Sequence, residues 1–556
     1  SLLGADGIRV GAAGRHDVST GAALEPSARM QVGSVAKTVT ALGILRLVSQ
    51  GRLDLDAELS TLLESPRIQN PWQATAPLRL RHLLDHTGGL DDARLWQVFT
   101  LRGDAARPLV EGLPSRLRLR TPPGRQMSYS NTGYLLAGMV IERVSGSRYE
   151  AWLDSALLAP LGMRHSSTTF VTQVDDPALA MGHFDASTPA ASVSFPVRPA
   201  IQLTTTAEDM ARLAQFLVSD GRLGDSVFVE PALLGAMARA KDTDAARAGL
   251  GVGYALGLLR RDRFDAIGHC HLGNQGNFRA VLCLYPAQGR AIFASYNSDP
   301  EGGNFARVDS LLIDALQLPP SAPAEPAMAD RALSALDGWY DIRPARFQQF
   351  AYLDALASPL RLRLTSDRTL QFAPLGGGIR ELTTLGAGRL RAAGRSEASH
   401  VVIRDADGRI GLSDGTQTWI RIPAWRLYLR WISAALGLLA LLALLGRGAW
   451  RAFRALHLGS KNTDSLRFAA TGVALLLLAP LGYLFSDAMA IGDPSVANIG
   501  VAVATSLLPV SLGASFVTSW RGSAPGRRID LALLLLSGQW CAVLAANGFL
   551  PLTLWR

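Results

Sequence analysis

A serine and a lysine stand three residues apart in the stretch Gly33-Ser34-Val35-Ala36-Lys37, at the start of an apolar run with helical spacing. Residues three apart on a helix share one face, about 5–6 Å apart at Cβ, so the Ser34 hydroxyl can meet the Lys37 amine. A serine becomes a nucleophile when a base removes its proton, and a lysine is such a base only when it is neutral. The pair predicts nucleophilic catalysis, with Ser34 as nucleophile and Lys37 as base.

Lysine is rare in this chain, which makes its presence at this position informative. It occurs only at Lys37, Lys241 and Lys461, among 55 lysines and arginines. Arginine keeps its proton in proteins, whereas a lysine can lose it. The alternative interpretation is a surface lysine on a helix that follows a capping serine. The match indicates catalysis only if partners for it exist elsewhere in the chain.

Tyr129-Ser130-Asn131 is the first candidate partner. A tyrosine hydroxyl beside a neutral lysine is expected to have a lowered pKa and to shuttle a proton. Asn131 is expected to donate to a substrate carbonyl and to hold Lys37 in place. The alternative is a core tyrosine beside a capping asparagine.

The second candidate partner is the stretch His271-Leu272-Gly273-Asn274. A glycine within a strand lets another backbone approach closely. We therefore expect the Asn274 N–H to join the Ser34 N–H as an oxyanion hole. His271 alone is also consistent with a structural or metal-ligating histidine, but no further ligands stand at metal spacing, so no metal and no cofactor is predicted.

These residues must be positioned by elements that the pattern also predicts. They are a helix at about 34–50, a turn at 121–124, a helix at about 133–144, strands within 250–300 and a helix at about 305–316.

In this order, Ser34-x-x-Lys37, Tyr129-x-Asn131 and His271-x-Gly273 resemble the three motifs of the serine beta-lactamase and penicillin-binding-protein superfamily, above all its class C beta-lactamase-like branch. The resemblance covers about residues 5–318, which we take as a hydrolase domain at 1–318. Its flanks agree at Leu83–Leu90, Pro123-Gly124 and Pro160-Leu161-Gly162-Met163.

The resemblance implies an α+β fold, an antiparallel sheet flanked by helices with a mainly helical subdomain beside it. It also implies that Ser34 attacks an amide or ester carbonyl, that Lys37 and Tyr129 share the base and acid roles, and that water releases the acyl group. The layout of hydrolase domain and membrane helices is similar to that of the colibactin-maturing peptidase. Asn277 departs from the family, which usually has glycine before this phenylalanine.

Two further segments follow the hydrolase domain. Residues 319–330 are a linker rich in proline and alanine. Residues 331–425 alternate with period two and contain a turn at Asp407-Gly408, which predicts a small antiparallel all-β module, a barrel or a sandwich. It contains no recognisable catalytic constellation, so its expected role is packing or covering.

Residues 426–556 are predicted to form a transmembrane domain with four helices. The expected spans are about 427–446, 468–486, 496–519 and 531–552. Basic residues gather in the loops 447–467 and 520–530, which the positive-inside rule places in the cytoplasm. Residues 1–425 and the C-terminus are then expected on the periplasmic side of a bacterial inner membrane.

The net charge of +9 does not indicate a nucleic-acid partner. Residues 426–556 hold 11 basic and 4 acidic residues, so the excess lies between the membrane spans. Cys270 and Cys283 can pair if neighbouring strands bring them together, although we expect free thiols. The chain starts at Ser1 rather than methionine, which is consistent with removal of a targeting segment.

The expected partners are the lipid bilayer and a small peptide-like or amphiphilic substrate, and nothing in the sequence indicates an oligomeric state. The leading hypothesis is a membrane-anchored serine hydrolase acting on a peptide-like amide, as a D-amino-acid-type or prodrug-activating peptidase. An esterase or a beta-lactamase is an alternative within this class. The rival class is a penicillin-binding sensor that stays acylated at Ser34, but cytoplasmic loops of about 21 and 11 residues are too short for an output domain.

Overall fold

The computed structural model describes residues 1–555 except 186, 301, 326–330, 367–368, 459–464 and 524–525. The end of the expected linker and Lys461 lie outside these described residues. The chain divides into two compact units. The first comprises Ser1–Ala93, Gly103–Arg346 and Leu360–Arg421, and the second comprises Arg94–Arg102, Phe347–Pro359 and Ile422–Arg556.

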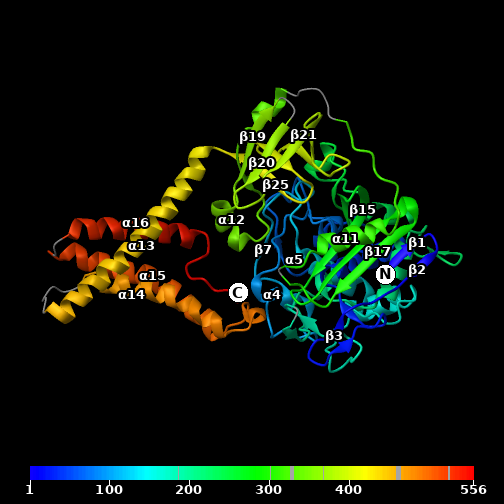
Figure 1. Cartoon of the computed structure of the whole chain (residues 1–556), viewed down its shortest axis with the longest axis horizontal. Helices are drawn as coiled ribbons and strands as arrows, with labels where there is room; N and C mark the ends of the chain where they lie inside the picture. The colour runs from blue at the N-terminus through cyan, green and yellow to red at the C-terminus, as the bar shows by residue number, and fades with distance from the viewer. Residues whose placement is uncertain are drawn as a thin grey trace. The chain divides into compact units, whose positions relative to one another are not determined.

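A seven-stranded antiparallel sheet forms the centre of one half of the first unit, with the order β13-β14-β15-β16-β17-β1-β2 (Figure 1). Helix α11 (Phe305–Asp314) covers one face, where Ile313 packs with Val281 and Ile292. Helix α8 (Ala207–Leu217) packs against β17 and β1. The strands are β1 (Leu2–Gly4), β2 (Gly7–Arg9), β13 (Gly253–Tyr254), β14 (Leu259–Arg263), β15 (Ala266–Asn274), β16 (Arg279–Tyr285) and β17 (Arg290–Tyr296).

The expectation of free thiols at Cys270 and Cys283 is wrong. The two residues stand directly opposite each other in the register of β15 and β16 and form a disulfide, with Cα atoms 4.1 Å apart. The pairing depends on strand register, which a single sequence does not specify. Cys541 is a buried free cysteine.

Helices beside the sheet position the candidate residues. Helix α1 (Ala36–Ser49) follows a 3-10 turn, η1 (Gly33–Val35), and is buried on nearly every side, as expected for a helix apolar all round. Helix α5 (Asn131–Ser145) begins where the Ser130 hydroxyl accepts from the Gly133 N–H and ends at the left-handed Gly146. The short helix α7 (Arg198–Ile201) packs against both.

The predicted all-β module is a closed eight-stranded barrel. Alternate residues of β19, Leu360 and Leu362, point into its core beside Tyr340 and Trp419, which accounts for the period of two. Its strands are β18 (Gly338–Ile342), β19 (Leu360–Ser366), β20 (Thr369–Pro374), β21 (Arg380–Gly386), β22 (Arg389–Ala392), β23 (His400–Arg404), β24 (Ile410–Ser413) and β25 (Thr418–Ile422).

The second unit contains four helices long and apolar enough to cross a membrane, which suggests a membrane protein. They run side by side, yellow to red in Figure 1. They are α13 (Ala424–Leu458), α14 (Arg467–Leu478) continued by η7 (Ala479–Phe485), α15 (Val496–Arg521) and α16 (Arg527–Ala546). The fold class expected from the sequence is confirmed.

Two of the helices have ends that differ from the expected spans. Helix α13 continues to Leu458, so Arg447 and Arg451 lie on a helix and not in a loop, because arginine favours helices. Helix α16 starts four residues early and ends at Ala546. It therefore includes the buried Asp530, whose carboxylate accepts from Arg447 at 2.7 Å and from Arg451 at 2.6 Å.

Candidate active site

Ser34 and Lys37 meet as their spacing predicts. Ser34 lies in the turn η1, and Lys37 lies in the first turn of α1. The Lys37 Nζ atom is 3.0 Å from Ser34 Oγ, 2.7 Å from Asn131 Oδ1 and 2.8 Å from the Ala200 carbonyl oxygen. Every one of these three neighbours is an uncharged oxygen.

Burial controls the protonation of Lys37. The side chain is completely buried, and loss of solvent is the main reason that its pKa lies well below the ordinary value. The carboxylate of Asp92 raises this pKa, and the guanidinium of Arg346 lowers it. The environment therefore favours the free amine that a general base requires.

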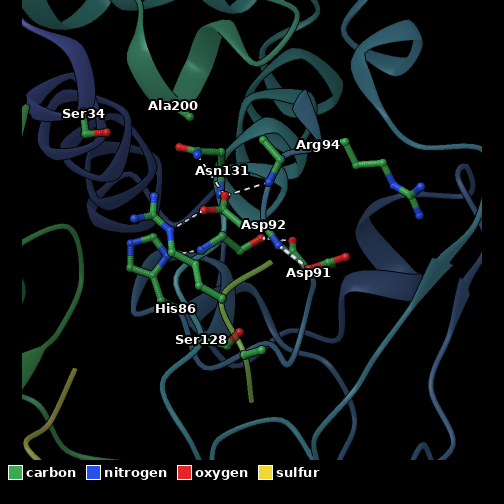
Figure 2. A network of polar contacts seen from close by, with 12 residues as sticks. Ser34, His86, Asp91, Asp92, Arg94, Ser128, Asn131 and Ala200 are labelled. Atoms are coloured by element: carbon green, nitrogen blue, oxygen red, sulfur yellow. Dashed lines mark hydrogen bonds and ion pairs between the residues drawn. The ribbon is translucent and has the colours of Figure 1, made fainter. Parts of the chain in front are cut away.

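Asn131 connects Lys37 to Asp92. Its backbone N–H and its Nδ2 both donate to Asp92 Oδ1, each at 2.8 Å, while its Oδ1 accepts from Lys37. Asp92 Oδ2 accepts from Arg346 Nε at 2.8 Å. Figure 2 shows Asn131 and Asp92 together in this polar network. Asn131 thus holds Lys37 as expected, with its amide group turned toward Asp92.

The expected lowering of the Tyr129 pKa is wrong. Burial of the hydroxyl raises its pKa well above the ordinary value, and Tyr254 raises it further, while a hydrogen bond with Ser34 opposes the shift. The His86 ring stacks on the Tyr129 ring at 4.2 Å, and His86 Nδ1 accepts from the Ser130 N–H. Tyr129 is therefore a neutral phenol beside Ser34, because burial outweighs the hydrogen bond with Ser34 and the guanidinium of Arg346, both of which lower the pKa.

Gly33 and Gly273 allow the turn η1 to lie directly against strand β15. A Cβ atom on Gly273 would come within 1.9 Å of the Val32 carbonyl oxygen, and one on Gly33 within 2.8 Å of the Asn274 nitrogen. Gly33 also has a φ of +52°. Only glycine fits either position, and the close approach brings the Ser34 and Asn274 backbones to the same wall of the cavity.

His271 lies behind this wall. It is buried, and burial lowers its pKa to about 3, with a further contribution from Lys37. Its Nδ1 is 2.9 Å from the Leu272 carbonyl oxygen. The Asn274 side chain points elsewhere and donates to Asp299. Asn277 donates from Nδ2 to the Ala190 carbonyl oxygen at 3.0 Å.

A cavity of about 460 Å³ opens over Ser34. Two arginines lie in its wall and, among the lining residues that the structure describes, no aspartate or glutamate does. The lining residues are Ser34, Met127, Ser128, Tyr129, Tyr254, Leu272, Gly273, Asn274, Arg279, Pro344, Arg346, Thr416 and Gln417.

The barrel, which was expected to pack or cover, also contributes residues to the lining of this cavity. Pro344 and Arg346 follow β18, and Thr416 and Gln417 form the turn between β24 and β25. The Arg343 N–H donates to the Thr418 carbonyl oxygen at 2.8 Å, which joins the two loops.

Sequence reasoning also missed His86, Asp92 and Tyr254. His86 lies within the family-like stretch Leu83–Leu90, for which the sequence indicates no role, and Asp92 follows it closely. No local signal marks Arg346, which lies more than 300 residues after Ser34 in a different module. Among the described residues, no group of three histidine, cysteine or acidic side chains forms a metal site.

Comparison with known proteins agrees with this geometry. The family model described as Beta-lactamase matches residues 4–317. Penicillin-binding protein 4 of Amycolatopsis lactamdurans is 28% identical over 283 residues, which are 49% of this chain and 72% of that protein. Penicillin-binding protein 4* of Bacillus subtilis (strain 168) is 30% identical over 151 residues, which are 26% of this chain and 31% of that protein.

A solved structure supports the fold. The crystal structure of SurE with D-Leu superposes with a TM-score of 0.50 at 24% identity and covers 76% of this chain and 94% of that one. At this identity the likeness concerns the fold alone. Because the family model matches more than half of this chain, the chain belongs to the beta-lactamase family.

Proposed function

We propose that the protein is a membrane-anchored serine hydrolase that acts through an acyl-enzyme at Ser34 on a peptide-like amide. The observation that carries the proposal is a completely buried Lys37 with its Nζ 3.0 Å from Ser34 Oγ. A serine hydroxyl is a weak nucleophile until a positioned base takes its proton. Membership of the beta-lactamase family supports the same chemistry.

The proposed acylation begins with Lys37 as a free amine. Its two N–H groups donate to Asn131 Oδ1 and the Ala200 carbonyl oxygen, so its lone pair faces Ser34 and accepts the hydroxyl proton. Ser34 Oγ then bonds to the substrate carbonyl carbon. The Ser34 and Asn274 N–H groups are proposed to donate to the resulting oxyanion.

Breakdown of this intermediate needs a proton on the departing nitrogen. Tyr129 is a protonated phenol hydrogen-bonded to Ser34, so we assign it the role of donating to the leaving group and of passing protons between that group and Lys37. Water then attacks the acyl-enzyme, with the same groups acting in the reverse sense. His271 and Gly273 support the wall that carries Asn274.

The substrate class rests on two supports. The relatives are named penicillin-binding proteins, and penicillin contains a strained cyclic amide. The cavity over Ser34 is lined by the hydroxyl and amide side chains of Ser128, Thr416 and Gln417, which can hydrogen-bond to the amide groups of a peptide-like substrate. A D-amino-acid-type or prodrug-activating peptidase fits both, and an esterase or a beta-lactamase is the second candidate because the acyl-enzyme chemistry is shared.

Intact mass measured over time tests the proposal. The full-length protein is mixed in turn with a D-amino-acid peptide, an activated ester and a beta-lactam. A hydrolase shows an acyl adduct that rises and decays while product accumulates, and Ser34→Ala shows no adduct. An adduct that persists with every compound, without product, would contradict hydrolysis and favour the acylated sensor.

We also propose that the chain lies in a bacterial inner membrane, with residues 1–425 and the C-terminus in the periplasm. Four apolar helices give an even number of crossings, and basic residues cluster where α13 ends and α16 begins. The Cys270–Cys283 disulfide is consistent with an oxidising compartment.

Reporter fusions test this orientation. An alkaline phosphatase reporter at the C-terminus should be active, and the same reporter inserted after Leu458 should be inactive. A cytoplasmic C-terminus would contradict four crossings.

A further inference from the structure

The loop after β18 carries an arginine from the barrel into the candidate site. Arg346 Nε donates to Asp92 Oδ2 at 2.8 Å, and its guanidinium lies over the Tyr129 ring, 4.8 Å from the ring centroid. Arg120 fixes the loop by donating from Nη1 to the Ala345 carbonyl oxygen at 2.6 Å. The ion pair between Arg346 and Asp92 is therefore fixed in place by the contacts of the loop that carries Arg346.

Asp92 poses an electrostatic problem for the base. Its carboxylate is completely buried and is joined to Lys37 through one residue, Asn131, by hydrogen bonds of 2.8 and 2.7 Å. This carboxylate raises the pKa of Lys37, because a nearby buried negative charge stabilises an ammonium ion. An ammonium ion at Lys37 has no lone pair with which to accept the proton of Ser34.

We propose that Arg346 is a positioning residue that the barrel supplies to the hydrolase: by pairing with Asp92 it cancels the carboxylate's charge and keeps Lys37 as the free amine. Asp92 can then fix Asn131, and through it Lys37, without protonating the base. The proposal rests on the proposed function, because it concerns the step in which Lys37 accepts the Ser34 proton. It assigns the barrel a part in catalysis as well as in covering the site.

The other titratable groups around Lys37 are neutral. The charged groups that affect the protonation of Lys37 are therefore Asp92 and Arg346. Burial lowers the pKa of His271 to about 3 and that of His86 well below its ordinary value. Burial raises the pKa of Tyr254 to about 12 and those of Tyr129 and Tyr134 well above the ordinary value. Near pH 7 these rings carry no charge.

The test is the pH dependence of serine phosphonylation in the full-length protein with an uncharged alkyl fluorophosphonate. In this reaction Ser34 Oγ bonds to phosphorus, fluoride leaves and Lys37 takes the hydroxyl proton, so the rate rises with pH as Lys37 loses its own proton. Arg346→Gln should move the midpoint of this rise upward by about one pH unit. The rate at the high-pH plateau should stay within about threefold of the wild type.

Matched variants separate charge from structure. Arg346→Lys keeps the positive charge and should restore most of the wild-type midpoint. Asp92→Asn combined with Arg346→Gln removes both charges and should also restore it, even if Arg346→Gln alone folds poorly. Arg343→Gln removes a neighbouring arginine that pairs with Asp341 outside the cavity, and it should leave the profile unchanged.

An Arg346→Gln variant that loses rate equally at every pH, or whose midpoint does not move, would overturn the proposal. Failure of the double variant to restore the midpoint would overturn it too. Undiminished phosphonylation of Ser34→Ala would instead refute the proposed function, so the two failures are distinguishable.

Discussion

Lys37 and Arg198 are both buried basic residues at the short helix α7, but their surroundings differ: Lys37 donates to the Ala200 carbonyl oxygen of this helix, and Arg198 is its first residue. Arg198 Nε donates to the Glu150 carboxylate at 2.8 Å, and its Nη2 donates to the Arg107 carbonyl oxygen at 2.9 Å. Lys37 contacts only uncharged oxygens directly. One base has a counter-ion within hydrogen-bond distance, and the other does not.

The difference distinguishes a structural base from a reactive one. A buried cation with a carboxylate partner keeps its charge and holds two segments together. A buried amine without one gives up its proton and becomes a base. An arginine cannot become a base in this way, because its guanidinium keeps its proton in any protein environment. Lysine at one position and arginine at the other therefore match the two roles.

The largest expected effect comes from replacing Lys37. Lys37→Met and Lys37→Arg should each lower the rate of Ser34 phosphonylation by at least roughly a hundredfold, since neither side chain can accept the proton. Lys37→Met should keep the melting temperature, because it buries an apolar group of similar shape. Lys241→Arg changes an exposed lysine and is the matched control. A Lys37→Arg variant with most of its rate would make Lys37 a structural base like Arg198.

Breaking the Arg198 pair should affect stability and not chemistry. Glu150→Gln leaves a buried guanidinium without its carboxylate, which costs about 3 kcal/mol and lowers the melting temperature. The phosphonylation rate of the folded protein should change less than threefold. Glu208→Gln, which breaks the exposed pair with Arg212, should change neither quantity. A large rate loss in Glu150→Gln would mean that Arg198 also serves the reaction.

His271 is a third buried basic residue, and burial makes it neutral. Its pKa of about 3 in the folded chain lies below the ordinary 6.5, so between these values the unfolded chain binds a proton that the folded chain does not. Its contribution to stability is complete above pH 6.5 and is lost as the pH falls toward 3. His271→Gln should therefore reduce the loss of stability between pH 7 and pH 5 by about 2 kcal/mol.

Thermal unfolding at the two pH values measures this effect. His165→Gln, at a side chain that is 71% exposed, should show no such change and serves as the control. Equal losses in the wild type and in His271→Gln would show that this histidine takes up its proton over the same pH range in the folded and unfolded chains.

The sequence predicts the local part of the site and misses what tertiary contacts add. Ser34 and Lys37 meet because helical spacing is a local property. Tyr129 and Asn274 are candidates from their residue types and neighbours, and the resemblance joins them to Ser34 and supplies the fold class. The direction of the Tyr129 pKa shift depends on burial, which no residue pattern displays. Arg346 reaches the site only because a barrel loop docks there.

The sequence pattern also does not predict strand register or the exact ends of the helices. The pairing of Cys270 with Cys283 requires the register of β15 on β16. Helix α13 extends past its apolar segment because arginine has a high helix propensity even where it is exposed to water. The alternation of residues in β19 correctly indicated a strand, because successive side chains of a strand point alternately into and out of a barrel.

Ser34 is proposed as the nucleophile, and the buried Lys37 as the base that activates it. Mapping the fluorophosphonate adduct by peptide mass spectrometry at pH 7 tests this most directly. We expect one adduct, on the peptide that contains Ser34, formed by the wild type and absent from Ser34→Ala, with both proteins melting at the same temperature. An adduct on another residue, or labelling of Ser34→Ala at the wild-type rate, would contradict it.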